Sequence, residues 1–427
     1  ILAVPTGILD VSGLASEVTF FAGTFEKLGV EAQFEGVGRY KNAPNQYTER
    51  GFTEPHREQM EALVGSLYEQ YLGAIASGRH KSRAEAEALI DGGPYDARQA
   101  QAVGLVDELV YADQLEGRFK DASRLTVGRY LRSDGPSAFD TRPRLALVYV
   151  VGEIASGRSS RGGLGGDVAG SDSIVAAIRK AREDEGVRAL VVRIDSPGGS
   201  GVASDVIWRE LRLTAARKPV VASMGDLAAS GGYYVAMGAD AIVAEPGTIT
   251  GSIGVFGGKF SLRGLYEKIG LSKEIVARGR NAALFTDYRA WSAEERAHVH
   301  GLMAAFYREF VSKVAERRGR SYEEIDAVAQ GRVWSGSEAV ERGLVDRLGG
   351  LEEAVALAKE RARLAADEEV ALQVLPEPRG FWELLSEGDD QLAETRLLPA
   401  EARRLLGFAL RAGPGPLARL PFELRVR

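Results

Sequence analysis

Two glycine-rich segments hold the residues whose types and spacing could support chemistry. DSPGGS at 195–200 directly follows the apolar run ALVVRI, and backbone N–H groups beside its glycines could bind an oxyanion. MGDLAASGGYYVAMGAD at 224–240 follows the run PVVAS, and there Ser230 would lie where a loop enters a helix. Its hydroxyl, the N–H of Gly231 and the positive end of the helix would then face one point, as acyl transfer requires. The alternatives are a tight turn at 195–200 and a simple helix N-cap at Ser230.

A nucleophilic serine needs a general base, because its hydroxyl is a weak nucleophile near neutral pH. Histidine is an unpromising base here, because we expect all four histidines to be ordinary surface residues: His56, His80, His298 and His300. A lysine can act instead if burial lowers its pKa from about 10.4 to between about 7 and 8. The chain has no cysteine, which excludes thiolate catalysis and cysteine-based metal sites. We therefore expect a serine and lysine pair that uses no metal and no cofactor.

An internal repeat indicates which lysine could serve. At an offset of 241 residues, VPTGILDVSG at 4–13 matches EPGTITGSIG at 245–254, and TFEKLGV at 24–30 matches LYEKIGL at 265–271. At the same offset GRYKNA matches GRNAAL, which places Lys41 opposite Ala282. One copy would thus supply Ser230, and the other would supply Lys41. The alternative is that Lys41 is a solvated surface residue.

The repeat also predicts the domain organisation. Residues 143–365 form a complete second copy that carries Ser230, whereas residues 1–125 match only its C-terminal part and carry Lys41. About 100 residues of the first repeat, including its serine position, would precede Ile1. Residues 126–142 have the composition of a linker, and residues 366–427 form a C-terminal extension of unknown role.

The second copy alternates strand-like and helix-like segments. Runs rich in β-branched residues at 144–151, 189–195 and 219–224 alternate with amphipathic stretches near 172–184 and 201–215. This alternation predicts a mainly parallel, buried sheet in an α/β fold. A glycine-rich loop is expected at 157–170, and a long helix at 292–318 would begin with a capping box of Ser292 and Glu295.

Charge and hydropathy exclude two classes of protein. The chain has 54 Lys and Arg against 60 Asp and Glu, a net charge of -6, without a basic block that could follow a phosphate backbone. Nucleic acid is therefore not an expected partner. No apolar run approaches the roughly 18 to 20 residues that a membrane span needs.

At these motifs the chain resembles signal peptide peptidase A, also called protease IV, in its long, internally duplicated form. The resemblance covers most of residues 1–365 and rests on DSPGG, SMGDLAASGGYY, PGTITGSIGVFG and GRYKNAP. It implies a fold similar to Clp protease and the crotonases, built as a tandem repeat of α/β units whose first repeat is truncated. It also implies a catalytic dyad of Ser230 and Lys41, in agreement with the internal comparison.

The resemblance implies further roles and partners. Ser252 of GSIG would hydrogen-bond the lysine amine, with an ordinary turn residue as the alternative. Gly199 and Gly231 would donate the oxyanion-hole N–H groups, and Gly198 would shape the loop. Expected substrates are apolar leader peptides such as cleaved signal peptides, and the expected assembly is a homo-oligomer at a membrane surface of the cell envelope. The family normally starts with a membrane anchor and a full first repeat, and we expect both to be absent from this chain.

Two other kinds of function stay open beside a serine endopeptidase. A crotonase-type acyl-CoA hydratase or isomerase shares the glycine-rich oxyanion loop but needs neither Ser230 nor Lys41. A degenerate peptidase fold could instead act only as a scaffold or bind a partner.

Overall fold

The chain folds into two compact units in the structure, a computed structural model that describes residues 1–119, 141–163, 166–376 and 417–419. Unit 1 comprises Ile1–Glu17 and the described part of Ala62–Thr141. Unit 2 comprises Val18–Glu61 and the described part of Arg142–Glu423. The segment around Lys41 therefore folds with the unit that contains Ser230.

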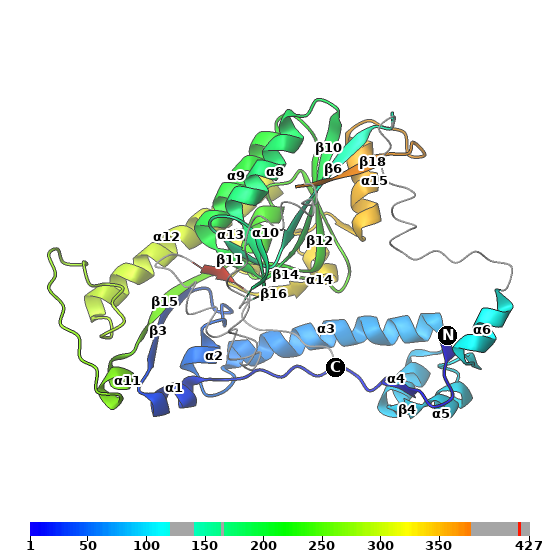
Figure 1. The fold of residues 1–427 in the computed structure, drawn as a ribbon, viewed down its shortest axis with the longest axis horizontal. Coiled ribbons are helices and arrows are strands. Elements are labelled where there is room, and N and C mark those ends of the chain that lie inside the picture. The colour runs from blue at the N-terminus through cyan, green and yellow to red at the C-terminus, as the bar shows by residue number, and fades with distance from the viewer. Residues whose placement is uncertain (120–140, 164–165, 377–416, 420–427) are drawn as a thin grey trace. The chain divides into compact units, whose positions relative to one another are not determined.

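An eight-stranded, mainly parallel sheet forms the centre of unit 2 (Figure 1). Its strands follow the order β16-β14-β12-β10-β6-β18, and β13 pairs with both β12 and β17. The pairs are parallel except for β14 with β16. The strands are β6 (Arg144–Val151), β10 (Val187–Ser196), β12 (Val220–Ala229), β13 (Ala241–Ala244), β14 (Ile249–Gly251), β16 (Val333–Ser335), β17 (Arg347–Leu348) and β18 (Ala371–Leu375). The α/β fold that the alternating runs predict is confirmed.

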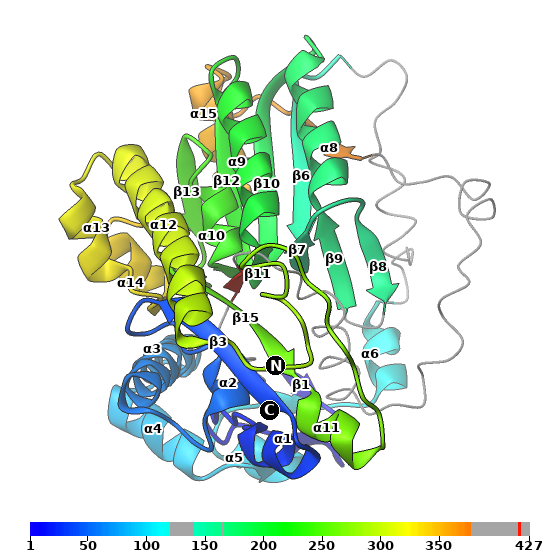
Figure 2. The same ribbon diagram turned by 90° about the vertical axis from the view of Figure 1, so that its left-hand side faces the viewer.

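Helices cover both faces of this sheet (Figure 2), because consecutive residues of a strand point to opposite sides. Val148 and Val150 of β6 belong to a core that includes α8, α9, α10, α12, α13 and α14, whereas Leu145 and Leu147 pack in a second core with α15. These helices are α8 (Ser171–Glu183), α9 (Gly201–Ala215), α10 (Gly231–Ala236), α12 (Ala293–Arg318), α13 (Tyr322–Val328), α14 (Gly336–Glu341) and α15 (Leu351–Arg361). Burial on both faces explains the near-continuous apolar runs of the central strands.

A second sheet of seven strands, in the order β3-β15-β19-β11-β7-β9-β8, also belongs to unit 2. Its strands are β3 (Glu31–Val37), β7 (Glu153–Ala155), β8 (Ser160–Gly163), β9 (Gly166–Gly170), β11 (Gly198–Ser200), β15 (Val255–Ser261) and β19 (Leu417–Arg419). Three short helices flank β3 and β15 in the chain, α1 (Ala22–Leu28), α2 (Asn45–Thr48) and α11 (Arg263–Lys268). β3 comes from the first copy of the repeat and β15 from the second, so this sheet joins the two copies.

Unit 1 consists mainly of helices. α3 (Glu54–Gly78) runs into it and is followed by α4 (Arg83–Asp91), α5 (Ala97–Ala102) and α6 (Ala112–Arg118). β1 (Leu2–Ala3) pairs with β5 (Glu108–Leu109), and β2 (Ile8–Leu9) pairs with β4 (Tyr95–Asp96). Leu89, Tyr95 and Leu105 lie in its small core.

Most elements expected from the sequence of the second copy are confirmed, including the helix that begins after Ser292. The Ser292 hydroxyl and the Glu295 side chain form the predicted capping box. The loop expected at 157–170 is wrong, because β8 and β9 pair antiparallel there and β9 pairs with β7. Glycine tolerates extended backbone as well as turns, so a glycine-rich composition does not exclude strands.

Two further expectations fall largely outside the described residues, namely the linker at 126–142 and the extension at 366–427. None of the described helices is both long enough and apolar enough to cross a membrane.

Candidate active site

Ser230 lies at the carboxyl end of the central strand β12, immediately before α10. β12 continues to Ala229, so strand replaces the loop that was expected before Ser230. The Ser230 N–H donates to the Gly251 carbonyl at 2.8 Å, which holds this junction against β14. Ser230 has a φ angle of 56° and a ψ angle of -111°, a sparsely populated conformation that costs a non-glycine residue about 1–3 kcal/mol. The surrounding strands must therefore enforce this backbone, which directs the fully buried side chain toward Lys41.

Lys41 reaches the same point from the first copy of the repeat. The chain leaves β3 after Val37, and the Lys41 N–H donates to the Gly38 carbonyl at 3.0 Å, which closes a tight turn. The Lys41 Nζ lies 2.8 Å from the Ser230 Oγ and 2.9 Å from the Ser252 Oγ. The three side chains singled out in the sequence thus meet, and a single chain supplies all of them.

The surroundings of the Lys41 amine favour its neutral form. The residue is only 6% exposed, and burial lowers the pKa of Lys41 well below the usual value for lysine. The hydrogen-bond partners of Nζ are the hydroxyls of Ser230 and Ser252 and the Ser252 carbonyl, at 3.1 Å. No carboxylate is among these partners, so none offsets the cost of burying a positive charge.

Ser252 lies in the connection between β14 and β15, opposite the lysine amine. It is fully buried, has a φ angle of 51°, and its N–H donates to the Arg332 carbonyl at 2.6 Å. Both of its oxygen atoms lie within hydrogen-bond distance of the Lys41 Nζ. The contact expected between Ser252 and the amine is therefore present, and the orienting role of Ser252 stays a prediction.

The loop at 329–332, which sequence reasoning missed, holds the backbone of the lysine segment. The Tyr40 N–H donates to the Gln330 carbonyl at 2.7 Å, and the Gly331 N–H donates to the Ile253 carbonyl at 2.7 Å. Gly331 has a φ angle of 73°, and a Cβ atom there would lie 2.7 Å from the Cα and Cβ atoms of Lys41. The loop thus joins the segment of Lys41 to the segment of Ser252. These contacts link positions far apart in the chain, and no local sequence pattern predicts them.

Two side chains from α12 and α13 hold this loop in turn. The Gln330 N–H donates to the Tyr307 hydroxyl at 3.2 Å, and the Gln330 Nε2 donates to the Asp326 carboxylate at 2.8 Å. The Tyr307 hydroxyl also donates to Asp326. Because Gln330 has a φ angle of 51°, these contacts must stabilise a conformation that is unfavourable for glutamine.

The two predicted oxyanion segments lie close together. Gly198 and Gly199 begin β11 with φ angles of 93° and 153°, which favour glycine, and a Cβ at Gly199 would lie 2.1 Å from the Ile154 carbonyl oxygen. On the other segment, a Cβ at Gly232 would lie 2.8 Å from the Ser196 carbonyl oxygen. DSPGG therefore packs against the start of α10, whose first residue is Gly231. The oxyanion-hole roles of these glycines stay predictions.

An extended segment of the chain lies along the same glycine-rich strand. β19 pairs antiparallel with β11 over Gly198–Ser200, and Leu417 also pairs with Phe256 of β15. The backbone beside the predicted oxyanion glycines can thus accept an added strand between β11 and β15.

The expectation that all four histidines are surface residues is wrong for His56. Its side chain is fully buried and packs against the rings of Phe20 and Phe52, with ring centroids 6.0 and 4.8 Å away. Neither ring nitrogen has a hydrogen-bond partner among the described residues, and burial lowers the pKa of His56 to about 4. The apolar cluster keeps the imidazole neutral, and His56 is not among the partners of Lys41.

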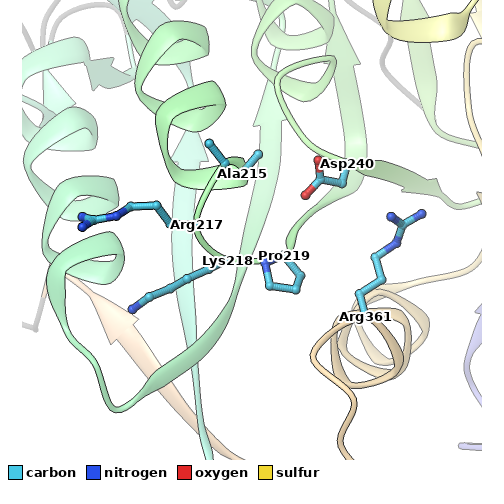
Figure 3. A pocket seen from close by; sticks show the side chains of 7 residues that line it. Ala215, Arg217, Lys218, Pro219, Asp240 and Arg361 are labelled. Atoms are coloured by element: carbon cyan, nitrogen blue, oxygen red, sulfur yellow. The ribbon is translucent and has the colours of Figure 1, made fainter.

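A surface pocket of about 340 Å³ lies elsewhere in unit 2 (Figure 3). Its lining residues are Ala215, Ala216, Arg217, Lys218, Pro219, Asp240 and Arg361. Several of them directly precede Val220, the first residue of β12, whereas Ser230 follows the last residue of that strand. The pocket thus lies at the opposite end of β12 from Ser230 and contains none of the predicted site residues.

Comparisons with known proteins match most of the chain. The model of peptidase family S49 matches residues 1–126 and 212–365. The chain is 35% identical over 390 residues to the chloroplastic serine protease SPPA of Arabidopsis thaliana, which covers 88% of this chain and 58% of that protein. It is 38% identical over 257 residues to the putative protease slr0021 of Synechocystis sp., which covers 60% of this chain and 88% of that protein.

The Arabidopsis protein is longer than this chain, and solved structures of similar proteins are known. The chain spans about three-fifths of the length of the Arabidopsis protein. Among solved structures it is similar to a point mutant of ClpP1 from Listeria monocytogenes, with 15% identity, a TM-score of 0.33, and coverage of 49% of this chain and 94% of that one.

Proposed function

The chain belongs to peptidase family S49, and we propose that it is a serine endopeptidase in which Ser230 is the nucleophile and Lys41 is the general base. The observation that carries this proposal is the contact of 2.8 Å between the Lys41 Nζ and the Ser230 Oγ. Both side chains are buried, and the amine has no charged hydrogen-bond partner. A neutral lysine amine at this distance can accept the hydroxyl proton.

The proposed reaction runs in two steps that share the same groups. Lys41 accepts the proton of the Ser230 hydroxyl while the Ser230 Oγ bonds to the carbonyl carbon of a peptide. The C–N bond then breaks, and the ammonium of Lys41 gives its proton to the leaving amine. A water molecule attacks the resulting ester by the same route, which releases the acid and restores Ser230. The N–H groups of Gly199 and Gly231 would stabilise the oxyanion in both steps.

Ser252 would keep the amine aimed at the nucleophile. Its hydroxyl and carbonyl lie 2.9 and 3.1 Å from the Lys41 Nζ, on a connection that the Arg332 carbonyl holds in place. A lysine side chain has four rotatable bonds, so fixing its end group in advance removes much of the entropic cost of proton transfer.

The proposed substrates are apolar peptides bound in an extended conformation, such as cleaved leader peptides. The pairing of β19 with β11 supports strand addition beside the oxyanion glycines, because an extended substrate can form the same antiparallel hydrogen bonds. The apolar character of the peptide and a location at a membrane surface of the cell envelope rest on the family resemblance alone.

The direct test uses a fluorophosphonate, which labels only activated serine hydroxyls. We expect one phosphonate adduct, at Ser230, and hydrolysis of a fluorogenic apolar peptide that is lost in Ser230→Ala and in Lys41→Met. Ser261 is a buried serine at the last position of β15. The variant Ser261→Ala should retain both the labelling of Ser230 and the hydrolysis of the peptide. An unlabelled Ser230 in the folded chain would instead favour the scaffold or the crotonase alternative.

A further inference from the structure

A group of polar and aromatic side chains beside Lys41 takes no part in the proposed reaction. The Tyr40 hydroxyl donates to the Glu58 carboxylate and lies 2.9 Å from each of its oxygen atoms. The Arg332 Nη1 donates to the same carboxylate at 2.8 Å. Tyr40 directly precedes Lys41 in the first copy of the repeat, whereas Arg332 belongs to the second copy. The Tyr40–Glu58–Arg332 cluster therefore connects the two copies close to the candidate active site.

The Arg332 guanidinium also holds Tyr40 through its aromatic ring. The guanidinium carbon lies 4.7 Å from the centre of the Tyr40 ring and 4.6 Å from the centre of the Trp334 ring. A guanidinium can pack on aromatic faces while its N–H groups bind a carboxylate. The Arg332 side chain is only 21% exposed, so its ion pair with Glu58 is partly shielded from water. Together these contacts fix the residue that precedes Lys41.

The backbone of Arg332 holds a partner of the lysine amine. The Arg332 carbonyl accepts the Ser252 N–H at 2.6 Å. The Ser252 hydroxyl and carbonyl in turn lie 2.9 and 3.1 Å from the Lys41 Nζ. Arg332 thus restrains both sides of this contact, Tyr40 through its side chain and Ser252 through its backbone. A displacement of Arg332 would therefore change the position of the amine relative to Ser230.

Helix α3 anchors the cluster from the first copy of the repeat. Glu58 lies near the start of this helix, and its neighbour Gln59 accepts the Val333 N–H at 3.0 Å through its side-chain oxygen. Gln59 is only 1% exposed, so water does not compete for this hydrogen bond. Val333 follows Arg332 and is the first residue of β16. The helix therefore fixes both the side chain of Arg332 and the strand that begins beside it.

The internal repeat indicates that this cluster belongs with the lysine. The repeat offset is 241 residues at Lys41 and 239 residues farther on, where SLYEQYL at 66–72 matches AFYREFV at 305–311. The positions equivalent to the cluster hold no phenol, no carboxylate and no guanidinium. They are Asn281 for Tyr40, Ala297 for Glu58 and Gly93 for Arg332. The counterpart of the lysine site, with Ala282 in place of Lys41, therefore lacks the whole cluster, as expected if the cluster serves the amine.

We propose that the Tyr40–Glu58–Arg332 cluster positions the Lys41 amine for proton transfer from Ser230. This inference rests on the proposed function, in which Lys41 is the general base. The cluster acts through the backbone and does not contact the reacting atoms. When the cluster is broken, the lysine segment gains freedom and water reaches the amine, which then binds a proton more tightly. The amine also spends less time in the geometry that proton transfer requires.

The pKa of Lys41 tests this proposal without requiring catalysis. The full chain, labelled with ¹³C at the lysine Cε atoms, is titrated by NMR, and Lys41→Met identifies the Lys41 signal. In Tyr40→Phe and in Glu58→Ala the midpoint should rise by about 0.5 to 1 pH unit, towards that of a solvated lysine. Tyr40→Phe removes one hydroxyl and no charge, so its shift reports the position of the amine, and it decides the outcome if Glu58→Ala does not fold. An unchanged midpoint in Tyr40→Phe would overturn the proposal.

Two arginines that share one aromatic ring provide a matched pair of variants. Arg332 and Arg342 both pack on the ring of Trp334. The ion-pair partner of Arg332 is Glu58, whereas that of Arg342 is Glu338. Arg332→Ala should slow the reaction with a fluorophosphonate at least tenfold, and Arg342→Ala should keep the wild-type rate. Equal rates in the two variants would contradict a role of the cluster in reactivity.

A double variant tests whether Tyr40 and Glu58 act together. Tyr40→Phe should slow the reaction of Ser230 with a fluorophosphonate about fivefold. Adding it to Glu58→Ala should cause no further loss, because both changes remove the same hydrogen bond. Losses that multiply in the double variant would show that the two residues act separately and would overturn the cluster as a unit. Circular dichroism confirms that each variant is folded. A wild type whose Ser230 is not labelled would contradict the proposed function alone, since the Lys41 titration still decides the role of the cluster.

Discussion

The Lys41 Nζ lies 2.8 Å from the Ser230 Oγ, although the two residues are 189 positions apart and belong to different copies of an internal repeat. The contact depends on long-range packing at two places. β3 pairs with β15, which places the turn that ends at Lys41, and the loop at 329–332 ties that turn to the segment of Ser252. The geometry of the pair is thus a property of how the two copies dock.

Replacing Gly331 tests the importance of this docking for activity. Alanine at Gly331 would place its Cβ 2.7 Å from Lys41 backbone and Cβ atoms, so we expect hydrolysis of a fluorogenic peptide to fall at least tenfold. Gly343→Ala is the matched control: its φ angle of 69° is equally unfavourable for alanine, but its Cβ would meet only the side-chain end of Arg320. Similar losses of activity in both variants would show that backbone strain alone is responsible.

Ser252→Ala should reduce kcat about fivefold and leave KM nearly unchanged. A hydrogen bond of this kind contributes about 1 kcal/mol, and in the proposed mechanism it orients the base and does not contact the substrate. The measurement is steady-state hydrolysis at a pH where Lys41 is neutral. A change confined to KM would contradict the orienting role, because it would place Ser252 in substrate binding.

Burial of Lys41 should make the stability of the chain depend on pH. Its folded pKa lies below its unfolded pKa of about 10.4, so between these values the unfolded state binds more protons. Wild-type stability should therefore rise with pH across this window, and that rise should be absent in Lys41→Met. Urea unfolding at a series of pH values measures the slope. Lys180→Met, which removes an exposed lysine, should keep the wild-type slope.

His56 should destabilise the folded chain in acid. Its pKa is about 4 in the folded state against about 6.5 in the unfolded state, so stability falls as the pH drops from 6.5 to 4, by about 3 kcal/mol. His56→Phe fits a cluster that already contains Phe20 and Phe52, and it should remove most of this loss. His298→Gln, at an exposed position, should change little. An unaltered acid dependence in His56→Phe would place the responsible group elsewhere.

The sequence predicts the central features of the fold and of the candidate site for identifiable reasons. Apolar runs such as 144–151 mark strands buried on both faces, and the capping box at Ser292 marks a helix start. The comparison of the two copies also identifies Lys41 as the candidate base, because Ala282 occupies the equivalent position in the second copy. These signals are local or repeat at a fixed offset, so they can be read from one chain.

Other features depend on contacts between distant positions and were not predictable. The burial of His56 follows from its packing against Phe20 and Phe52, because histidine as a residue type is neither clearly buried nor clearly exposed. The role of Gln330 follows from hydrogen bonds to Tyr307, Asp326 and the backbone of Tyr40. The strands β8 and β9 replace an expected loop because pairing partners override a glycine-rich composition.

The rate at which a fluorophosphonate acylates Ser230, measured as a function of pH in the wild type and in Lys41→Met, tests the central claim most directly. This reaction needs an activated serine but no peptide recognition. The wild-type rate should rise with pH and reach a plateau below about 10.4, since the buried amine loses its proton more readily than a solvated lysine. In Lys41→Met the rate should be lower by a factor of about 10²–10⁴, without that rise. Equal rates and equal pH profiles in the two proteins would contradict the assignment of Lys41 as the base of Ser230.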